Sequence, residues 1–380
     1  MHAFTGTLAL GTNAGIFRLN DGGSTGSGPN FGSAQATFDV GTGSATLLQR
    51  NGGTVSYFGA LLGGPNTKLG GNTVNAGNVT YVIGGKGADT AFQGTIADGI
   101  SPTFLVKEGV GTLTLSASNT FTGGTTISNG VLALTGSGSL LTTPTITVMT
   151  NTVLDVSTRT DGTLTLRTGQ GLLGDGTVRG SVNVPSGASL SPGPSAGAIG
   201  LLAITNTLVL QSGSILNLDL DWYQYLGGAT HDQIAGLASV TYGGTLNLNV
   251  NSLETNSVFK LFSAGTYSGS FAVINPPAPS LSPGTWVWDT SRLAVDGTLR
   301  VALLRPLVNT LEWTGTDVIL RGTNGTPYST YHVLSSTNIS LPVSLWLPIA
   351  TNLFEYDGTF NATNAIAPGV RQAFYLIQVP

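Results

Sequence analysis

The stretch LVKEGVGTLTLSASNTFTGGTTISNGVLAL (105–134) decides the fold of this chain. It contains two short runs, GTLTL (111–115) and GVLAL (130–134), in which apolar residues alternate at the period of a β-strand. The segment between them, ASNTFTGGTT (117–126), is rich in Gly and Asn, which adopt positive φ at little cost. The stretch therefore predicts a strand, a sharp corner and a second strand.

The same apolar alternation recurs along the chain, which is the pattern of a repeat protein. Internal similarity at about 20 residues indicates a solenoid, in which one repeat is one coil and buries its apolar face only when neighbours stack on it. We expect about 12 to 15 coils of about 20 to 25 residues, with Leu113 and Leu115 stacked on Leu132 and Leu134. Further runs of this kind are TLAL (7–10), GTLTL (162–166), GSILNL (213–218), GTLNL (244–248) and GTLRV (297–301).

The composition favours an all-β extracellular protein. Gly makes up 55 of the 380 residues, and charged residues only 8%, against about 25% in an ordinary soluble domain. Thr, Ser and Asn supply the polar positions instead, and their side chains compete with helix hydrogen bonds. Because 40% of the residues are apolar and recur in alternating runs, the chain is not expected to be disordered.

Several classes of partner and cofactor are disfavoured by the same composition. The net charge is −4, and the 14 Lys and Arg residues are scattered singly, so no basic surface points to nucleic acid. Without Cys there is neither a disulfide framework nor a thiolate metal site. No run approaches 18 uninterrupted apolar residues, so no membrane helix is expected. The start, MHAFTGTLALGTNAG (1–15), lacks the regions of a secretory signal, which suggests a removed signal or a fragment.

The chain also resembles a known family. Residues 105–134 are similar, through nearly all of their 30 positions, to the β-strand repeat associated with autotransporter passenger domains. Two later stretches, 190–220 with 231–250, and 271–301, resemble the conserved later part of such passengers. The resemblance implies a right-handed parallel β-helix over residues 1–304.

The C-terminal part departs from that family. An autotransporter ends in an outer-membrane barrel of paired amphipathic strands, and that pattern is not found here, so we expect a passenger-type β-helix without its translocator. After a Pro-containing linker (305–310), residues 311–380 have denser aromatics. They resemble the small β-sandwich module that ends many secreted bacterial proteins.

Two motifs with chemical meaning are interpreted as corners. Residues 193–197 (GPSAG) fit the nucleophile elbow, but no helix is predicted after them, and the partners Asp232 and His332 fall in different predicted modules. Residues 84–92 (GGKGADTAF) fit one copy of a calcium-binding nonapeptide, whose adjacent coil is missing, so Asp89 is expected to sit at a Gly-rich corner.

Acidic and histidine residues give no stronger site. Asp219 and Asp221 alternate on one strand face, with Asp232 downstream, and such a cluster could hold Ca²⁺ or act on an acidic polysaccharide. Lys and Arg are absent from residues 180–259, so a lyase would lack its base, and we expect these carboxylates to keep a strand edge soluble. The three histidines, His2, His231 and His332, are far apart and predict no metal site. No catalytic, cofactor or metal residue is therefore predicted.

Aromatic residues offer one possible binding surface. Flat rings for stacking on sugars could be presented by Trp222, Tyr223 and Tyr225, and separately by Trp286 and Trp288, because residues i and i+2 share a strand face. The same rings could instead cap the end of the solenoid or fill its junction with the terminal module.

Two functions from different classes remain open. The first is a non-enzymatic extracellular structural or adhesive surface protein that associates head to tail with itself, because an open solenoid exposes an unpaired strand edge at each end. The second is a carbohydrate-binding or polysaccharide-lyase-like β-helix, with surface glycans as partners. A passenger fragment whose barrel lies on another chain is a third interpretation.

Overall fold

The protein is described by a computed structural model, in which residues 4–12, 14–19, 31–195, 197–221, 230–254, 257–281, 286–366 and 369–379 are described. The chain separates into two compact units. Unit 1 comprises residues 1–253, 258–276 and 290–299, and unit 2 comprises residues 254–257, 277–289 and 300–380. The structure is almost entirely β, and no described helix is long and apolar enough to span a membrane.

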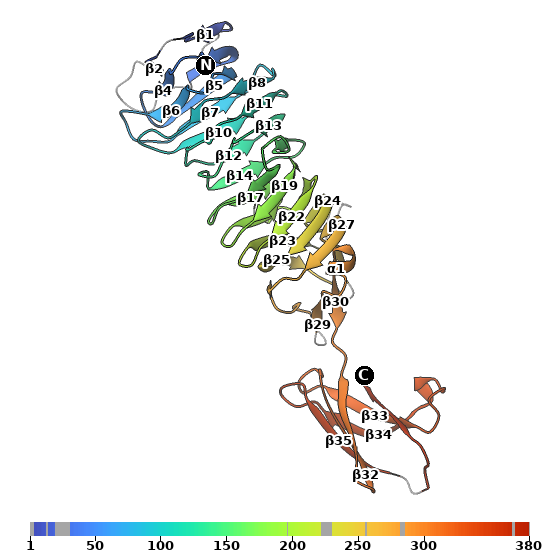
Figure 1. Cartoon of the computed structure of the whole chain (residues 1–380). Coiled ribbons are helices and arrows are strands. Elements are labelled where there is room, and N and C mark those ends of the chain that lie inside the picture. The colour runs from blue at the N-terminus through green and yellow to red at the C-terminus, as the bar shows by residue number, and fades with distance from the viewer. Residues whose placement is uncertain are drawn as a thin grey trace. The chain divides into compact units, whose positions relative to one another are not determined.

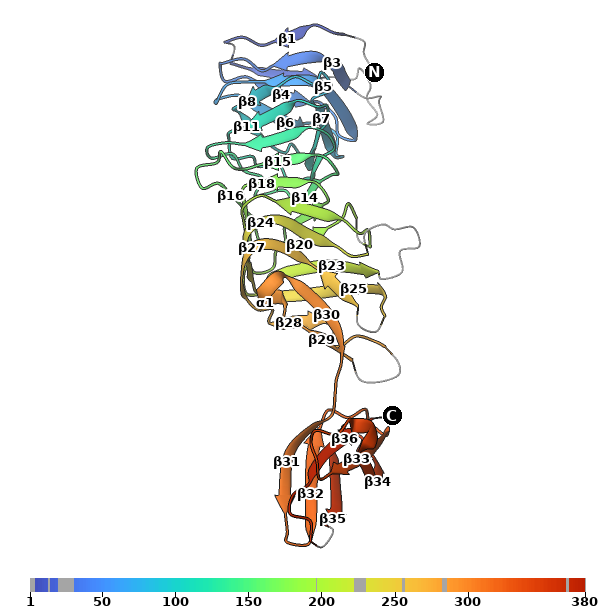
Figure 2. The same ribbon diagram turned by 90° about the vertical axis from the view of Figure 1, so that its right-hand side faces the viewer.

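Unit 1 is a stack of parallel strands built around one long sheet (Figures 1 and 2). Each strand of this sheet pairs in parallel with the strand one coil further along the chain. Its twelve described strands, within the expected number of coils, are β1 (Thr7–Ala9), β3 (Phe31–Asp39), β5 (Thr54–Leu62), β7 (Val79–Ile83), β10 (Thr103–Lys107), β12 (Thr125–Ile127), β14 (Thr145–Val148), β17 (Gly171–Gly174), β20 (Ser189–Pro192), β23 (Ile215–Asp221), β25 (Thr245–Ser252) and β28 (Val273–Asn275).

Two further sheets complete the coils. The smaller one holds β2 (Ile16–Leu19), β4 (Thr46–Gln49), β6 (Lys68–Asn72) and β9 (Thr95–Ile96). The larger one holds β8 (Thr90–Phe92), β11 (Thr112–Leu115), β13 (Val131–Leu134), β15 (Val153–Asp155), β16 (Thr163–Thr165), β18 (Thr177–Arg179), β19 (Ser181–Val184), β21 (Leu201–Ile204), β22 (Thr207–Leu210), β24 (Gln233–Tyr242) and β27 (Phe262–Gly269). In this sheet β24 is long enough to pair with both β21 and β22, so it joins two series of strands.

The core of unit 1 consists of inward side chains stacked one per coil. Leu113 pairs with Leu132 and Leu115 with Leu134, and all four side chains are buried, which confirms the stacking predicted from the repeat. A second column runs through the long sheet and contains only apolar residues and one Thr, namely Leu105, Thr125, Ile146, Leu172, Leu190, Leu216, Leu246 and Ile274. The parallel β-helix expected from the sequence is therefore the fold of unit 1.

Glycine is required where the corners of successive coils lie against each other. Gly109, between β10 and β11, has φ +68°, and a Cβ atom there would lie 1.9 Å from the carbonyl oxygen of Gly84 in the preceding coil. A side chain at this corner would therefore force the two coils apart.

Near residue 300 the chain leaves the stacked coils. The short helix α1 (Leu293–Asp296) packs on β27. β26 (Val258–Lys260) precedes β27 in the chain, and β29 (Trp286–Asp289) pairs antiparallel with β30 (Thr298–Leu303).

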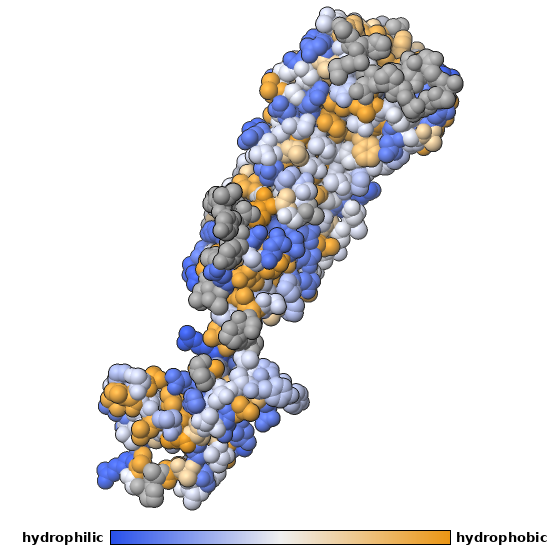
Figure 3. Space-filling model, turned by 180° about the vertical axis from the view of Figure 1, so that it is seen from behind, coloured by the Kyte–Doolittle hydropathy of each residue, from blue (hydrophilic) through white to orange (hydrophobic). Residues whose placement is uncertain are grey.

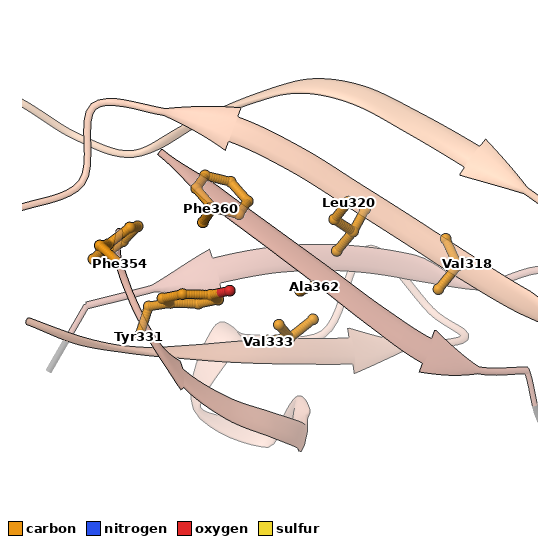
Figure 4. Close-up of a cluster of buried hydrophobic side chains, with 7 residues drawn as sticks. All are labelled: Val318, Leu320, Tyr331, Val333, Phe354, Phe360 and Ala362. Carbon is orange, nitrogen blue, oxygen red and sulfur yellow. The ribbon is translucent and has the colours of Figure 1, made fainter. Parts of the chain in front are cut away.

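The C-terminal residues form two antiparallel sheets of three strands each. One sheet has the order β31 (Leu307–Trp313), β32 (Asp317–Thr323) and β35 (Phe360–Ala365). The other has the order β34 (Leu347–Leu353), β33 (Thr330–Ser336) and β36 (Phe374–Gln378), with a 3₁₀ turn at Val343–Leu345. Both sheets contribute to one buried cluster, drawn in Figure 4, of Val318, Leu320, Tyr331, Val333, Phe354, Phe360 and Ala362.

The stacked columns predict where the fold is most sensitive to mutation. Leu132→Ala removes a buried side chain from the centre of a column, so we expect the free energy of unfolding to fall by about 2–5 kcal/mol. Val110→Ala, at a corner where the side chain is 74% exposed, is the matched control and should change it by less than about 0.5 kcal/mol. Chemical denaturation followed by circular dichroism measures both, and equal effects would contradict the assigned packing.

Candidate functional site

Within the repeat at residues 105–134, a buried asparagine joins three coils. The Asn119 side chain is 3% exposed. Its Oδ1 accepts the N–H of Ile96 in the preceding coil at 2.9 Å, and its Nδ2 donates to the carbonyl of Ser139 in the next coil at 3.2 Å. A third bond, from Nδ2 to the Ala117 carbonyl, holds its own coil. This residue therefore stabilises the stack and is not available to a ligand.

A buried lysine has a similar structural role. The Lys107 side chain is 1% exposed, and its ammonium donates to the carbonyls of Glu108 and Gly109, both at 2.8 Å, and of Asn129 at 3.1 Å. Burial lowers the pKa of Lys107 to about 8. The three carbonyls satisfy all three N–H donors, so the cation ties its corner to the next coil.

Asp89, in the segment that fits a calcium nonapeptide, hydrogen-bonds to the neighbouring coil. Its Oδ1 accepts the backbone N–H of Thr112 at 2.7 Å. Within the described ranges, no three His, Asp or Glu side chains lie together as they would around a metal ion.

The carboxylates of β23 and of Asp232, directly before β24, contact neighbouring chain segments. Asp232 is fully buried, and its two oxygens accept the N–H groups of Gly200 at 2.7 Å and of Asp219 at 2.8 Å. Asp219 accepts a bond from Asn249 at 2.6 Å, and Asp221 one from Ser252 at 2.6 Å. Asp219 and Asp232 are therefore close together, because the carboxylate of Asp232 accepts the backbone N–H of Asp219.

The segment that fits a nucleophile elbow lies between two strands. Residues 189–192 belong to β20 and residues 201–204 to β21, so no helix follows the motif. Gly193 has φ +91°, and a Cβ atom there would lie 1.9 Å from the carbonyl oxygen of Ala198. Ser195 is exposed at this turn. Of its two suggested partners, Asp232 is buried and hydrogen-bonds to the backbone, and His332 belongs to unit 2.

The two described histidines each lie beside groups of their own unit. Nδ1 of His231 is 3.0 Å from the Thr230 hydroxyl and Nε2 is 3.2 Å from the Lys260 carbonyl, and burial lowers the pKa of this imidazole. Nδ1 of His332, in β33, is 2.8 Å from the Thr351 hydroxyl. His2 lies outside the described residues.

Of the five aromatic residues nominated for sugar contact, the structure describes two. Trp286 and Trp288 lie in β29, and each is only 8% exposed. Trp222, Tyr223 and Tyr225 lie outside the described residues. Glycan contact at all five positions stays a prediction.

The surface of unit 1 seen in Figure 3 mixes polar and apolar residues, and much of it is of intermediate hydropathy. Several apolar residues are partly exposed at the end of unit 1 that carries β1. Leu8 of β1 stacks on Phe38, and Phe17 of β2 on Leu47. Phe4 is 42% exposed and lies nearly perpendicular to the Phe38 ring at a centroid distance of 6.3 Å, and Phe17 is 36% exposed.

The other end of unit 1 is partly covered. α1 packs on β27, and the Tyr242 hydroxyl donates to the Leu293 carbonyl at 2.9 Å. β28 ends the long sheet on this side, with Val273 46% exposed. A cavity of about 130 Å³ lies beside Ile274, between β28 and α1.

Sequence reasoning did not find the structural roles of Asn119 and Lys107. The sequence carries no signal that separates them from other polar residues of the same stretch, such as Glu108 and Asn129. A buried position for such groups requires complete hydrogen bonding.

The buried carboxyl of Asp232 predicts that the stability of the fold depends on pH. Burial raises the pKa of this carboxyl from 3.8 to about 7, against the opposing effect of its two N–H donors. The folded state then binds the proton more tightly than the unfolded state, so this contribution to stability is full below about pH 4 and is lost as pH rises through about 7.

Asp232→Asn removes the titrating group and serves as the reference. The difference in unfolding free energy between the native chain and this variant should grow as pH falls from 7 to 4. A carboxyl ¹³C titration by NMR should have its midpoint near pH 7, and a midpoint near pH 4 would contradict the assignment.

Comparison with known proteins agrees with this structure. Residues 105–134 match the model of the passenger-associated transport repeat. The chain is also similar to the adhesin BmaC autotransporter of Brucella suis biovar 1 (strain 1330), with 29% identity over 217 residues. That match covers 54% of this chain and 6% of the adhesin. Together with the parallel coils, these similarities support the resemblance of this β-helix to autotransporter passengers.

Proposed function

We propose that this chain is a non-enzymatic extracellular surface protein, whose β-helix is adhesive or structural and associates head to tail with copies of itself into a fibre or matrix. The observation that carries the proposal is the pair of edge strands, β1 and β28, that end the long parallel sheet among its described strands. An edge strand presents unpaired N–H and C=O groups and is a template for pairing with another chain.

The similarities support an adhesive role. The matched relative is an adhesin, and passenger domains imply a surface or secreted location. The match covers a small part of that adhesin, so adhesion by this chain rests on the likeness of the β-helix.

The use of the polar groups supports a non-enzymatic role. Lys107, Asp89 and Asp232 hydrogen-bond to the backbone of neighbouring segments. A catalytic acid or base needs a proton donor or acceptor within reach of a substrate, and these groups are engaged in holding the coils.

Three finer structural features belong to the same proposal. We propose that the helix is right-handed, as the resemblance implies, and spans residues 1–304. Residues 305–310 then act as a linker, and residues 311–380 form a β-sandwich module, supported by the buried cluster that both of its sheets share.

The proposal predicts that association depends on the β1 end. Phe17→Glu places a charge on the partly exposed end of an inward column, so we expect the concentration at which oligomers form to rise at least tenfold. Leu141→Glu is the matched control, because Leu141 is 46% exposed at a corner between β13 and β14, and it should leave association unchanged.

Light scattering over a concentration series measures the effect, with thermal melting to verify that both variants are folded. A native chain that stays monomeric at all concentrations would refute self-association. Equal weakening by both variants would show that the β1 end has no special role.

A further inference from the structure

We propose that two copies of this chain associate through the surface of residues 339–353 in unit 2, in a two-fold contact between like surfaces. This inference goes beyond the head-to-tail association proposed above, because a contact between like surfaces closes on itself. The partner is a second copy of this chain.

Exposed apolar side chains are concentrated in this segment. Of the 27 large apolar side chains that the described residues expose, seven lie in residues 339–353. They are every second residue from Ile339 to Ile349, and Leu353. Their exposed fractions range from 39% to 70%. Soluble proteins rarely leave large apolar patches exposed, and such a patch usually marks an interaction site.

Hydrogen bonds hold the segment in this exposed conformation. The indole N–H of Trp346 donates to the carbonyl of Leu341 at 3.1 Å. The backbone N–H groups of Leu345 and Trp346 donate to the carbonyls of Pro342 and Val343, and these bonds form the 3₁₀ turn. β34 follows the turn and pairs antiparallel with β33. The exposed side chains therefore belong to a surface with a fixed backbone.

The open edge of β34 is poorly suited to the addition of another strand. β34 is an edge strand among the described strands of its sheet. It contains Pro348, and Pro342 stands shortly before it, so two backbone N–H donors are missing. Pro in an edge strand is one of the features that block pairing with another chain. We therefore expect a partner to pack on the side chains of the segment.

The lack of charge favours a second copy as that partner. Residues 322–354 contain no Asp, Glu, Lys or Arg. In a two-fold contact each surface meets its own copy, so charged side chains of one sign would face each other and repel. A membrane with anionic lipids, in contrast, attracts segments rich in Lys and Arg. An uncharged apolar segment therefore fits a copy of itself.

The apolar area is close to what a dimer needs. A standard interface buries about 800 Å² on each partner, of which somewhat more than half, roughly 450 Å², is apolar. At about 100 Å² for a fully exposed Leu, Ile or Val side chain, the seven side chains together expose about 380 Å². The segment therefore supplies most of the apolar area of a stable two-fold contact.

Sedimentation velocity of the full chain over a concentration series tests this contact. The measurement uses the Phe17→Glu background, in which association at the β1 end is expected to be weakened. This chain should form a dimer, and adding Leu347→Asp should raise the dissociation constant of the dimer at least tenfold, because it places a charge in the apolar contact. Leu345→Asp, in the turn before β34, should have the same effect and is the second variant.

Leu311→Asp in the same background is the matched control. Leu311 is 57% exposed in β31, which is an edge strand of the other sheet, so its substitution should leave the dissociation constant unchanged. Thermal melting verifies that each variant is folded. In the native chain, hydrogen exchange followed by mass spectrometry should show that residues 339–353 become protected as the concentration rises.

The outcomes separate this contact from the head-to-tail association. A dimer that persists in Phe17→Glu and is lost with Leu347→Asp would support it, whatever Phe17→Glu does to longer oligomers. A Phe17→Glu chain that is monomeric at every concentration would refute it, and equal weakening by Leu347→Asp and Leu311→Asp would place the contact elsewhere. Monomers that bind neutral phosphatidylcholine vesicles through Leu347 would assign the segment to a lipid surface and overturn the inference.

Discussion

The structure depends on the vertical stacking of inward side chains between successive coils. A single coil has no core of its own, and its apolar residues are buried only by the coil before and the coil after it. The column from Leu105 to Ile274 shows how strict this constraint is, because each position is occupied by an apolar residue or a buried Thr. That column is kept aligned by the parallel register, by Gly residues at the corners and by buried polar groups that hydrogen-bond between coils.

The same constraint explains why the polar groups inside the coils are hydrogen-bonded to neighbouring segments. Lys107, Asn119 and Asp232 are buried, and each is satisfied by backbone groups of neighbouring segments. A buried polar group left unpaired costs free energy, so such residues persist in a core where every donor or acceptor finds a partner. Their hydrogen bonds link neighbouring segments at defined positions.

Much of the fold could be predicted from the sequence, because the strand period and the Gly-rich corners occur again in each repeat. The pairing of Leu113 with Leu132 follows from the strand period and the spacing of two runs. The long β24, which joins two series of strands, and helix α1 on β27 could not be predicted, since each is a local departure from the repeat. The resemblance of residues 105–134 to a passenger repeat was confirmed by comparison.

The candidate site was less predictable than the fold. Trp286 and Trp288 could have presented rings to a sugar or filled the end of the solenoid, and each is only 8% exposed. The burial of a strand outside the repeat depends on contacts that have no periodic signal in the sequence. The proposed function rests instead on the edge strands at the ends of the stack, which follow from the sheet topology and not from a sequence motif.

Electron microscopy of the purified chain at rising concentration tests the central claim most directly. The account predicts unbranched filaments whose length grows with concentration. Single particles of uniform length at every concentration would contradict it.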